Sequence, residues 1–156
     1  MTRDNAVGRL LGIYIAARAE EMHRSLEKVQ ALAGRGLEGD RYAAKTGTFS
    51  DRPKRRDVTL IEAEELDAYE RRSGKKLSAA ESRRNLLTQG VRLNDLVGRE
   101  FQVGAARMRG LHLSEPCTHL VRLTHPETLP GLAHRAGLVA EILNDGELRV
   151  GDAVKS

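Results

Sequence analysis

The stretch Leu138-Val139-Ala140-Glu141-Ile142-Leu143-Asn144-Asp145-Gly146-Glu147-Leu148-Arg149-Val150 decides the class of fold. Two runs of strand-forming residues, 138–143 and 147–150, stand on either side of Asn144-Asp145-Gly146. Asn, Asp and Gly tolerate the backbone of a tight turn, and Asp-Gly between two such runs is a strong hairpin signal. We therefore predict a β-hairpin at this point of the chain.

Short runs of the same kind recur along the rest of the sequence. They lie at 7–17, 58–61, 85–88, 100–103 and 106–113, with Gly104 between the last two. Residues 19–33 fit either a helix or a strand, because their apolar residues satisfy both spacings. Many short strands separated by turns are typical of β-barrels. We predict a mainly β (α+β) fold, a barrel of about seven or more strands with a few short helices.

One helix is clearly predicted, over Glu62–Ser73. Acidic residues crowd its first turn and Arg71 and Arg72 stand at its end, as the helix dipole favours, while Gly74 can form the C-terminal cap. The polar stretch that follows is assigned to no element. A single helical turn is predicted at 93–96, and a closing turn at Gly151-Asp152.

The composition is that of a globular protein. The 156 residues are 40% hydrophobic and 31% charged, so we expect one domain over 1–156 with a real core. No apolar run is long enough to cross a bilayer, and residues 1–5 lack the pattern of a signal peptide, so no membrane association is expected. One cysteine cannot form an intramolecular disulfide, which favours a reducing, cytoplasmic setting.

The charge balance restricts the class of partner. The net charge of +4 allows an anionic partner, although 26 basic residues stand against 22 acidic ones. Aromatic residues make up only 3% of the chain, and single-strand nucleic-acid modules rely on stacking aromatics, so we expect no nucleic-acid partner. The run Lys54-Arg55-Arg56 fits a solvated loop, or alternatively a docking site for an acidic protein.

The single cysteine lies in Leu113-Ser114-Glu115-Pro116-Cys117-Thr118-His119-Leu120. Sulfur transfer and soft-metal binding both need an accessible thiolate. Free cysteine is often a small buried residue, but Pro116 and the polar neighbours argue against full burial here. In a strand, His119 would share a face with Cys117 and could pair with it. A zinc site is not favoured, because the other histidines considered as ligands are scattered, at His112, His125 and His134.

Two further runs are candidate walls of a pocket around the cysteine. In Ser82-Arg83-Arg84-Asn85-Leu86, Arg84 and Asn85 offer a guanidinium and an amide, and arginine suits bidentate binding of phosphate or carboxylate. The alternative for this run is a solvated charge that precedes a strand.

The second run is Gly34–Tyr42, which holds three glycines before Asp40 and Arg41. Backbone amides near the glycines, together with Arg41, could line an anion site, although glycines in ordinary turns are common. Near the other end of the chain, His134 and Arg135 either border the same pocket or lie in a solvated loop.

The order of these motifs is itself informative. In sequence order the chain holds Gly36-Leu37-x-Gly39-Asp40-Arg41-Tyr42, Val58-Thr59-Leu60-Ile61-Glu62, Arg84-Asn85-Leu86, Gly90-Val91-x-Leu93-x-x-Leu96-x-Gly98, Pro116-Cys117, Gly137-Leu138-x-Ala140 and Gly151-Asp152. No single motif is specific, but the ordered set resembles a stand-alone, bacterial-type MOSC domain, the module named for the C-terminal part of molybdenum-cofactor sulfurases. The resemblance runs from about Gly8 to Val154.

The resemblance implies a mostly β-barrel fold and a functional role for the motif cysteine, which matches Cys117. In one branch of the family this cysteine is thought to carry sulfur as a persulfide. In another it ligates the molybdenum of a bound pterin cofactor (molybdopterin), in enzymes that reduce N-hydroxylated compounds. The chain lacks the aminotransferase-like domain of larger members, so pyridoxal phosphate and intrinsic desulfurase activity are not expected. It also lacks the added modules of the reductases, which leaves their electron donor without a counterpart here.

Three functions remain open on these grounds. In the first, the domain is a sulfur carrier or sulfurtransferase, in which Cys117 takes sulfur from a partner cysteine desulfurase and passes it to a sulfur-acceptor protein for metal-sulfur or molybdenum-cofactor chemistry. In the second, it is a molybdenum-cofactor-dependent oxidoreductase with Cys117 as the metal ligand. In the third, it is a non-catalytic module that binds an anionic or protein partner. The sulfur role ranks first because the chain is minimal and holds one thiol.

Overall fold

The computed structural model describes residues 7–17, 23–40, 57–114 and 137–156. Cys117, His119, His134, Arg135 and Arg41 lie outside the described residues.

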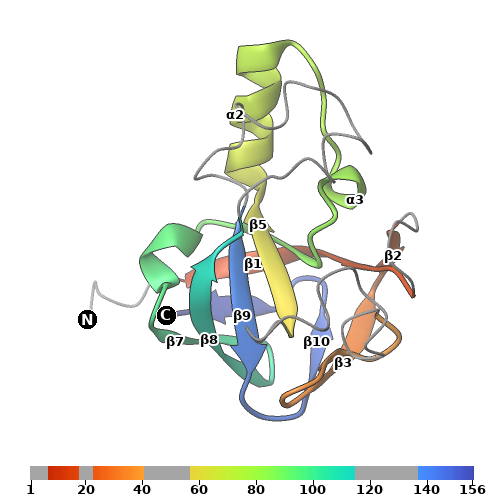
Figure 1. The fold of residues 1–156 in the computed structure, drawn as a ribbon, viewed down its shortest axis with the longest axis vertical. Helices are drawn as coiled ribbons and strands as arrows, with labels where there is room; N and C mark the ends of the chain where they lie inside the picture. Colours follow the sequence, from red (N-terminus) through yellow and green to blue (C-terminus); the bar gives the residue numbers. More distant parts are fainter. Residues whose placement is uncertain (1–6, 18–22, 41–56, 115–136) are drawn as a thin grey trace.

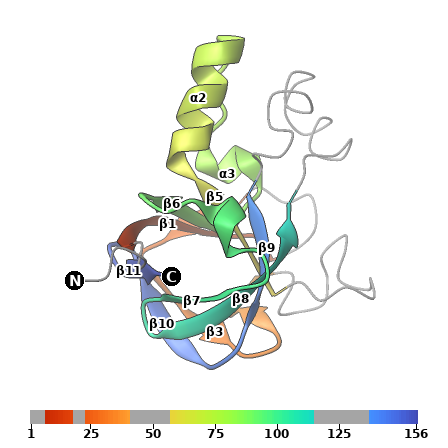
Figure 2. The same ribbon diagram turned by 90° about the vertical axis from the view of Figure 1, so that its left-hand side faces the viewer.

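Seven strands form a closed barrel (Figure 2). They are β1 (Val7–Ile15), β5 (Val58–Glu62), β6 (Leu86–Gln89), β7 (Glu100–Val103), β8 (Ala106–Leu113), β9 (Leu138–Ile142) and β11 (Ala153–Lys155). Around the ring the order is β11-β7-β8-β9-β5-β6-β1, and the pairing of β1 with β11 closes it. All neighbours are antiparallel except β5 and β6, which run parallel. The predicted mainly β barrel is confirmed.

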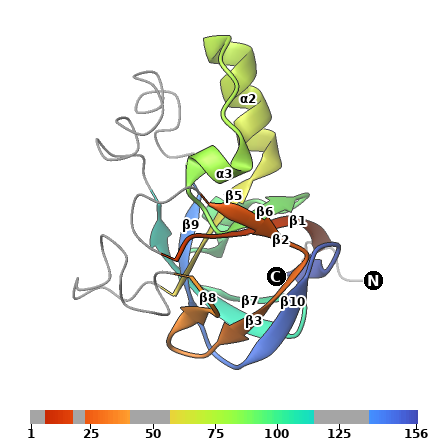
Figure 3. The same ribbon diagram turned by 90° about the vertical axis from the view of Figure 1, so that its right-hand side faces the viewer.

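Four further strands lie outside this ring. Strand β2 (Arg24–Leu26) pairs with the end of β1 (Figure 3). Strands β10 (Gly146–Arg149), β3 (Lys28–Leu32) and β4 (Gly36–Leu37) form a separate three-stranded sheet at one end of the barrel (Figure 1). Buried side chains of this small sheet belong to the same apolar cluster as the barrel interior. The small sheet therefore covers that end of the core.

The barrel interior is filled by apolar side chains, which alternate with exposed residues in β7 and in the first part of β8, whereas β5 and β9 are buried at consecutive positions. In β8, Ala106 and Met108 are fully buried while Arg107 and Arg109 are exposed. This period of two places one face of such a strand in the core. Complete burial of a Leu or Ile side chain is worth about 1.5–3 kcal/mol, so the interior is the main source of stability.

Helix α2 (Ala63–Ser73) lies outside the barrel and projects from it (Figure 1). Leu66 and Tyr69 pack with Ile61 of β5 in a second apolar cluster. Gly74 ends the helix at φ 72°, and its N–H donates to the carbonyl of Glu70. The predicted helix and its glycine cap are therefore confirmed, as is the short helical turn, η1 (Leu93–Leu96).

The predicted hairpin at 138–150 is wrong. Strand β9 pairs with β8 and β5, whereas β10 pairs with β3 in the other sheet. The turn between them is held by its own side chains. Asn144 Oδ1 accepts a hydrogen bond from the Arg107 N–H at 2.8 Å, and Asp145 Oδ1 accepts one from the Ala33 N–H at 2.7 Å. These bonds direct the chain from the barrel to the small sheet instead of folding it back on itself.

Three elements were not assigned from sequence, and one of them is the two-residue strand β4 in the glycine-rich run. The polar stretch after α2 contains α3 (Ala79–Ser82), which begins at a capping box formed by Ser78 and Glu81. The short strand β11 follows the predicted turn at 151–152. The described part of the ambiguous segment 19–33 forms strands β2 and β3, so the strand reading holds there. Among the described residues, no helix is long and apolar enough to span a membrane.

We predict that Gly137→Ala destabilises the protein more than Gly151→Ala. Both glycines have positive φ, +108° and +100°, so alanine strains the backbone by about 1–3 kcal/mol at either site. At Gly137 the new Cβ would also collide with the backbone carbonyl of Leu60, while nothing lies within 4 Å at Gly151. Urea denaturation should show an extra loss of about 1–2 kcal/mol for Gly137→Ala. Equal losses would contradict the packing described here.

A second prediction concerns Glu62, whose Oε2 accepts a hydrogen bond from the Leu93 N–H at 3.1 Å. Burial raises the pKa of this half-buried carboxyl above 4.5, outweighing the effect of that bond. The folded state then binds more protons than the unfolded state, so the contribution of Glu62 to stability falls as pH rises from about 4.5 through the raised pKa. Relative to Glu62→Gln, the wild type should therefore lose stability over this window. Parallel pH profiles of the unfolding free energy would contradict this.

Candidate functional site

The candidate residue Asn85 is a buried junction between three strands. Its Oδ1 accepts hydrogen bonds from the N–H and the hydroxyl of Thr59, at 3.0 and 3.2 Å. Its Nδ2 donates to the carbonyl of Tyr14 at 3.1 Å, and its own carbonyl accepts from the Tyr14 N–H at 2.7 Å. Asn85 thus ties β1 to the start of the parallel pair β5 and β6.

Asp40 reaches the same end of β1 from the glycine-rich turn. Its fully buried carboxylate accepts a hydrogen bond from the Ala16 N–H at 3.0 Å. Gly39, at φ +86°, and the bond from the Asp40 N–H to the Leu37 carbonyl shape the turn that brings it there. The run that contains Asn85 and the run that contains Asp40 are distant in the sequence, but both contact the end of β1 at Tyr14–Ala16.

Arg84 follows an unusual turn of the backbone. Arg83 has φ 63° and is the only non-glycine residue with positive φ in the described part of the chain. It is also buried, at 8% exposure. Such conformations cost of order 1–3 kcal/mol and cluster at functional sites. Sequence reasoning did not select Arg83; its only signal was the capping box just before two consecutive arginines.

The guanidinium of Arg84 connects the turn at Ser82 and Arg83 to the end of β8. Its Nη2 donates to the carbonyl of Ser114 at 3.1 Å, and its Nη1 donates to the carbonyl of Ser82 at 3.4 Å. The Ser114 N–H donates in turn to the carbonyl of Gly137 at 2.8 Å. Ser114 and Gly137, the described residues on either side of 115–136, therefore lie side by side, and Arg84 contacts Ser114.

The structure brings together the three described candidates, Asp40, Arg84 and Asn85, at the ends of β1 and β8. The remaining candidates lie outside the described residues and stay predictions: Arg41, Cys117, His119, His134 and Arg135. Within the described ranges, no group of three or more His, Cys, Asp or Glu side chains could hold a metal ion.

His112 is a further residue of this region that sequence reasoning treated as scattered. Its Nδ1 lies 3.0 Å from the carbonyl of Leu113, while its Nε2 is shielded from solvent and has no hydrogen-bond partner among the described residues. A β-bulge between Gly110 and His112 shifts the register just before it. His112 stands opposite Val139, which stands opposite Thr59, the partner of Asn85. No signal in the sequence identifies this histidine, because the bulge and the pairing are tertiary features.

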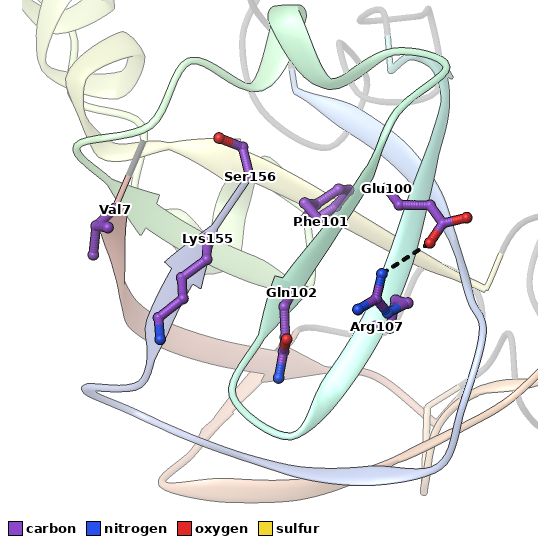
Figure 4. A pocket seen from close by; sticks show the side chains of 7 residues that line it. All are labelled: Val7, Glu100, Phe101, Gln102, Arg107, Lys155 and Ser156. Carbon is purple, nitrogen blue, oxygen red and sulfur yellow. Dashed lines mark hydrogen bonds and ion pairs between the residues drawn. The ribbon is translucent and has the colours of Figure 1, made fainter. Parts of the chain in front are cut away.

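A hollow of about 430 Å³ lies elsewhere, on the outer wall of the barrel (Figure 4). It is lined by Val7, Glu100, Phe101, Gln102, Arg107, Lys155 and Ser156, none of them a candidate residue. Glu100 forms ion pairs with Arg107 at 3.0 Å and with Arg109 at 2.9 Å. The hydrogen bond from Arg107, followed by that from Arg109, lowers the pKa of Glu100. Two of the charged residues that line the hollow, Glu100 and Arg107, are therefore paired with each other.

We predict that Asn85→Ala destabilises the fold by about 3 kcal/mol, because buried groups on Thr59 and Tyr14 lose their partner. The matched control is Gln89→Ala at the exposed end of β6, the strand that follows Asn85, which should change the unfolding free energy by less than about 0.5 kcal/mol. Chemical denaturation measures both. A loss below 1 kcal/mol for Asn85→Ala would mean that the junction is not structural.

The sequence matches the MOSC domain family over residues 43–155. No curated protein matches the chain. Several solved structures share its fold. The YuaD protein from Bacillus subtilis has a TM-score of 0.83 and 17% identity, with 97% of this chain and 96% of that chain covered. YiiM from Geobacillus stearothermophilus has a TM-score of 0.73 and 15% identity, with 96% and 75% covered. YiiM from Escherichia coli has a TM-score of 0.67 and 17% identity, with 94% and 68% covered.

Proposed function

The chain belongs to the MOSC domain family, and on this premise we propose that it is a sulfur carrier, or sulfurtransferase, whose working group is Cys117. The observation that carries the proposal is the hydrogen bond from Arg84 to the carbonyl of Ser114. Cys117 follows Ser114 by three residues in the sequence, and three residues of chain span at most about 11 Å. The guanidinium is thus attached at the base of the segment that carries the only thiol.

A cation beside a thiol supports this chemistry, because it favours the thiolate form. In the proposed step the thiolate of Cys117 attacks the outer sulfur of a donor persulfide. The bond between the two donor sulfur atoms breaks, a new sulfur–sulfur bond forms on Cys117, and the donor leaves as a thiolate. The outer sulfur moves without net oxidation or reduction. A cysteine desulfurase is the class of partner that supplies such a persulfide, and a sulfur-acceptor protein would receive the sulfur.

A second candidate function is the binding of a molybdenum cofactor, with Cys117 as the ligand of the metal. The observation that favours it is the pair Arg83 and Arg84, one buried in a strained backbone conformation and the other attached to Ser114. Guanidinium groups suit the phosphate of an anionic pterin cofactor, so the donor set fits. Such a group, when bound, supplies a redox centre. The arginines of this chain would bind and orient it.

The test is intact mass and elemental analysis of the native protein, purified from a host that makes the molybdenum cofactor and incubated with a desulfurase and cysteine. We predict the gain of one sulfur atom, removed by a reductant and absent from Cys117→Ser. Arg84→Gln should slow the gain about tenfold, the effect expected for loss of one charge-assisted interaction. Far-UV circular dichroism confirms that each variant is folded.

Measurements on the same samples distinguish the sulfur-carrier function from the molybdenum-cofactor function. Sulfur gained equally by Cys117→Ser would reject the carrier. Stoichiometric molybdenum that disappears with Cys117→Ser would favour the cofactor function instead.

A further inference from the structure

The hollow on the outer wall of the barrel lies on a row of side chains that crosses four strands. Val7 of β1 stands opposite Lys155 of β11, which stands opposite Gln102 of β7. Arg107 of β8 continues the row, because it stands opposite Gln102. Directly opposed residues of neighbouring strands share a face and lie about 4.5–5.5 Å apart. These four exposed residues, the outer row, therefore line the hollow as neighbours (Figure 4).

The charge of Lys155 is the one that the hollow leaves without a partner. The carboxylate of Glu100 is already engaged by two guanidinium groups, those of Arg107 and Arg109. Within the described part of the chain, Lys155 has no hydrogen-bond or ion-pair partner for its ammonium group. Ser156, which also lines the hollow, has an interaction of its own in which Lys155 takes no part. The hollow therefore offers one ammonium group to an anionic ligand.

The same hollow also offers apolar surface. Val7 is 62% exposed, more than the other large hydrophobic residues at the described surface. Phe101, which is 3% exposed, lies in the lining beneath the outer row. A single exposed valine is ordinary, but this one borders a concave surface next to a charge that has no partner. Covering such apolar area is worth about 25 cal/mol per Å², so a ligand gains from contact with Val7.

The size of the hollow indicates the class of ligand. Its volume of about 430 Å³ falls among small-molecule sites, which span roughly 300–1,000 Å³. A stable protein partner would instead cover about 800 Å² of surface on each side. The carboxylate of Glu100 borders the hollow and repels anions, so a ligand with one negative charge fits better than one with several.

We propose that the outer-wall hollow binds a small carboxylate that carries an apolar chain. The carboxylate pairs with the ammonium group of Lys155, and the chain covers Val7 and the edge of Phe101. None of the lining residues belongs to the proposed sulfur site, so this inference does not rest on that function.

The test follows the backbone amide resonances of Lys155 and Gln102 by NMR at constant ionic strength. Wild-type protein is titrated with sodium hexanoate, with sodium acetate, which has the charge but no chain, or with 1-hexanol, which has the chain but no charge. We expect saturable shifts with hexanoate at a concentration at least about fivefold lower than with either partial ligand. Shifts that do not saturate, or an equal response to acetate or hexanol, overturn the proposal.

Variants assign the two contacts. Lys155→Gln should weaken hexanoate binding about threefold, the effect of an exposed ion pair, and Val7→Ser should weaken it about fivefold through lost apolar contact. The matched control is Lys28→Gln, which removes the charge of another exposed lysine, in β3 of the small sheet, and should leave the affinity unchanged. Wild-type affinity in Lys155→Gln, or an equal loss in Lys28→Gln, would show that hexanoate binds elsewhere and would overturn the proposal.

Discussion

Closure of the barrel by β1 and β11 is the constraint on which the remaining structure depends. The Leu10 N–H donates to the carbonyl of Asp152 at 2.8 Å, and the Gly151 N–H donates to the carbonyl of Leu10 at 2.7 Å. A closed ring has no free edge, so the backbone groups of its strands are paired all the way around. Closure also fixes which face of every strand points inward, and with it which residues are left to build a site outside.

The candidate site exists because the ring contains one parallel pair. Strands β5 and β6 begin at the same end, so Thr59 and Asn85 lie side by side and bond to each other. Parallel neighbours need a crossover connection, which here holds α2 and α3. The crossover connection ends near Arg83, which has a positive φ. The turn at Arg83 places Arg84 in contact with Ser114. Fold and site are thus two results of the same topology.

The sequence predicts those features that local pattern controls. Strands β7 and β8 alternate cleanly around Gly104 and lie where they were expected. The incorrect hairpin prediction shows what local pattern does not determine. Asp145 favours a turn, but it does not determine which strand β10 pairs with. The helix α3 was readable from its capping box and was missed. The unpaired nitrogen of His112 was not readable, since it follows from long-range pairing at a bulge.

The bond between Ser114 and Gly137 has a consequence for how such a domain diversifies. The two described residues that flank segment 115–136 are bonded to each other, so a change in the length of that segment leaves its two points of attachment side by side. Closing a loop of doubled length costs only about 0.6 kcal/mol more in chain entropy. Selection or engineering can therefore vary the number of residues between Ser114 and Gly137 while the barrel strands and the contact between Arg84 and Ser114 stay the same.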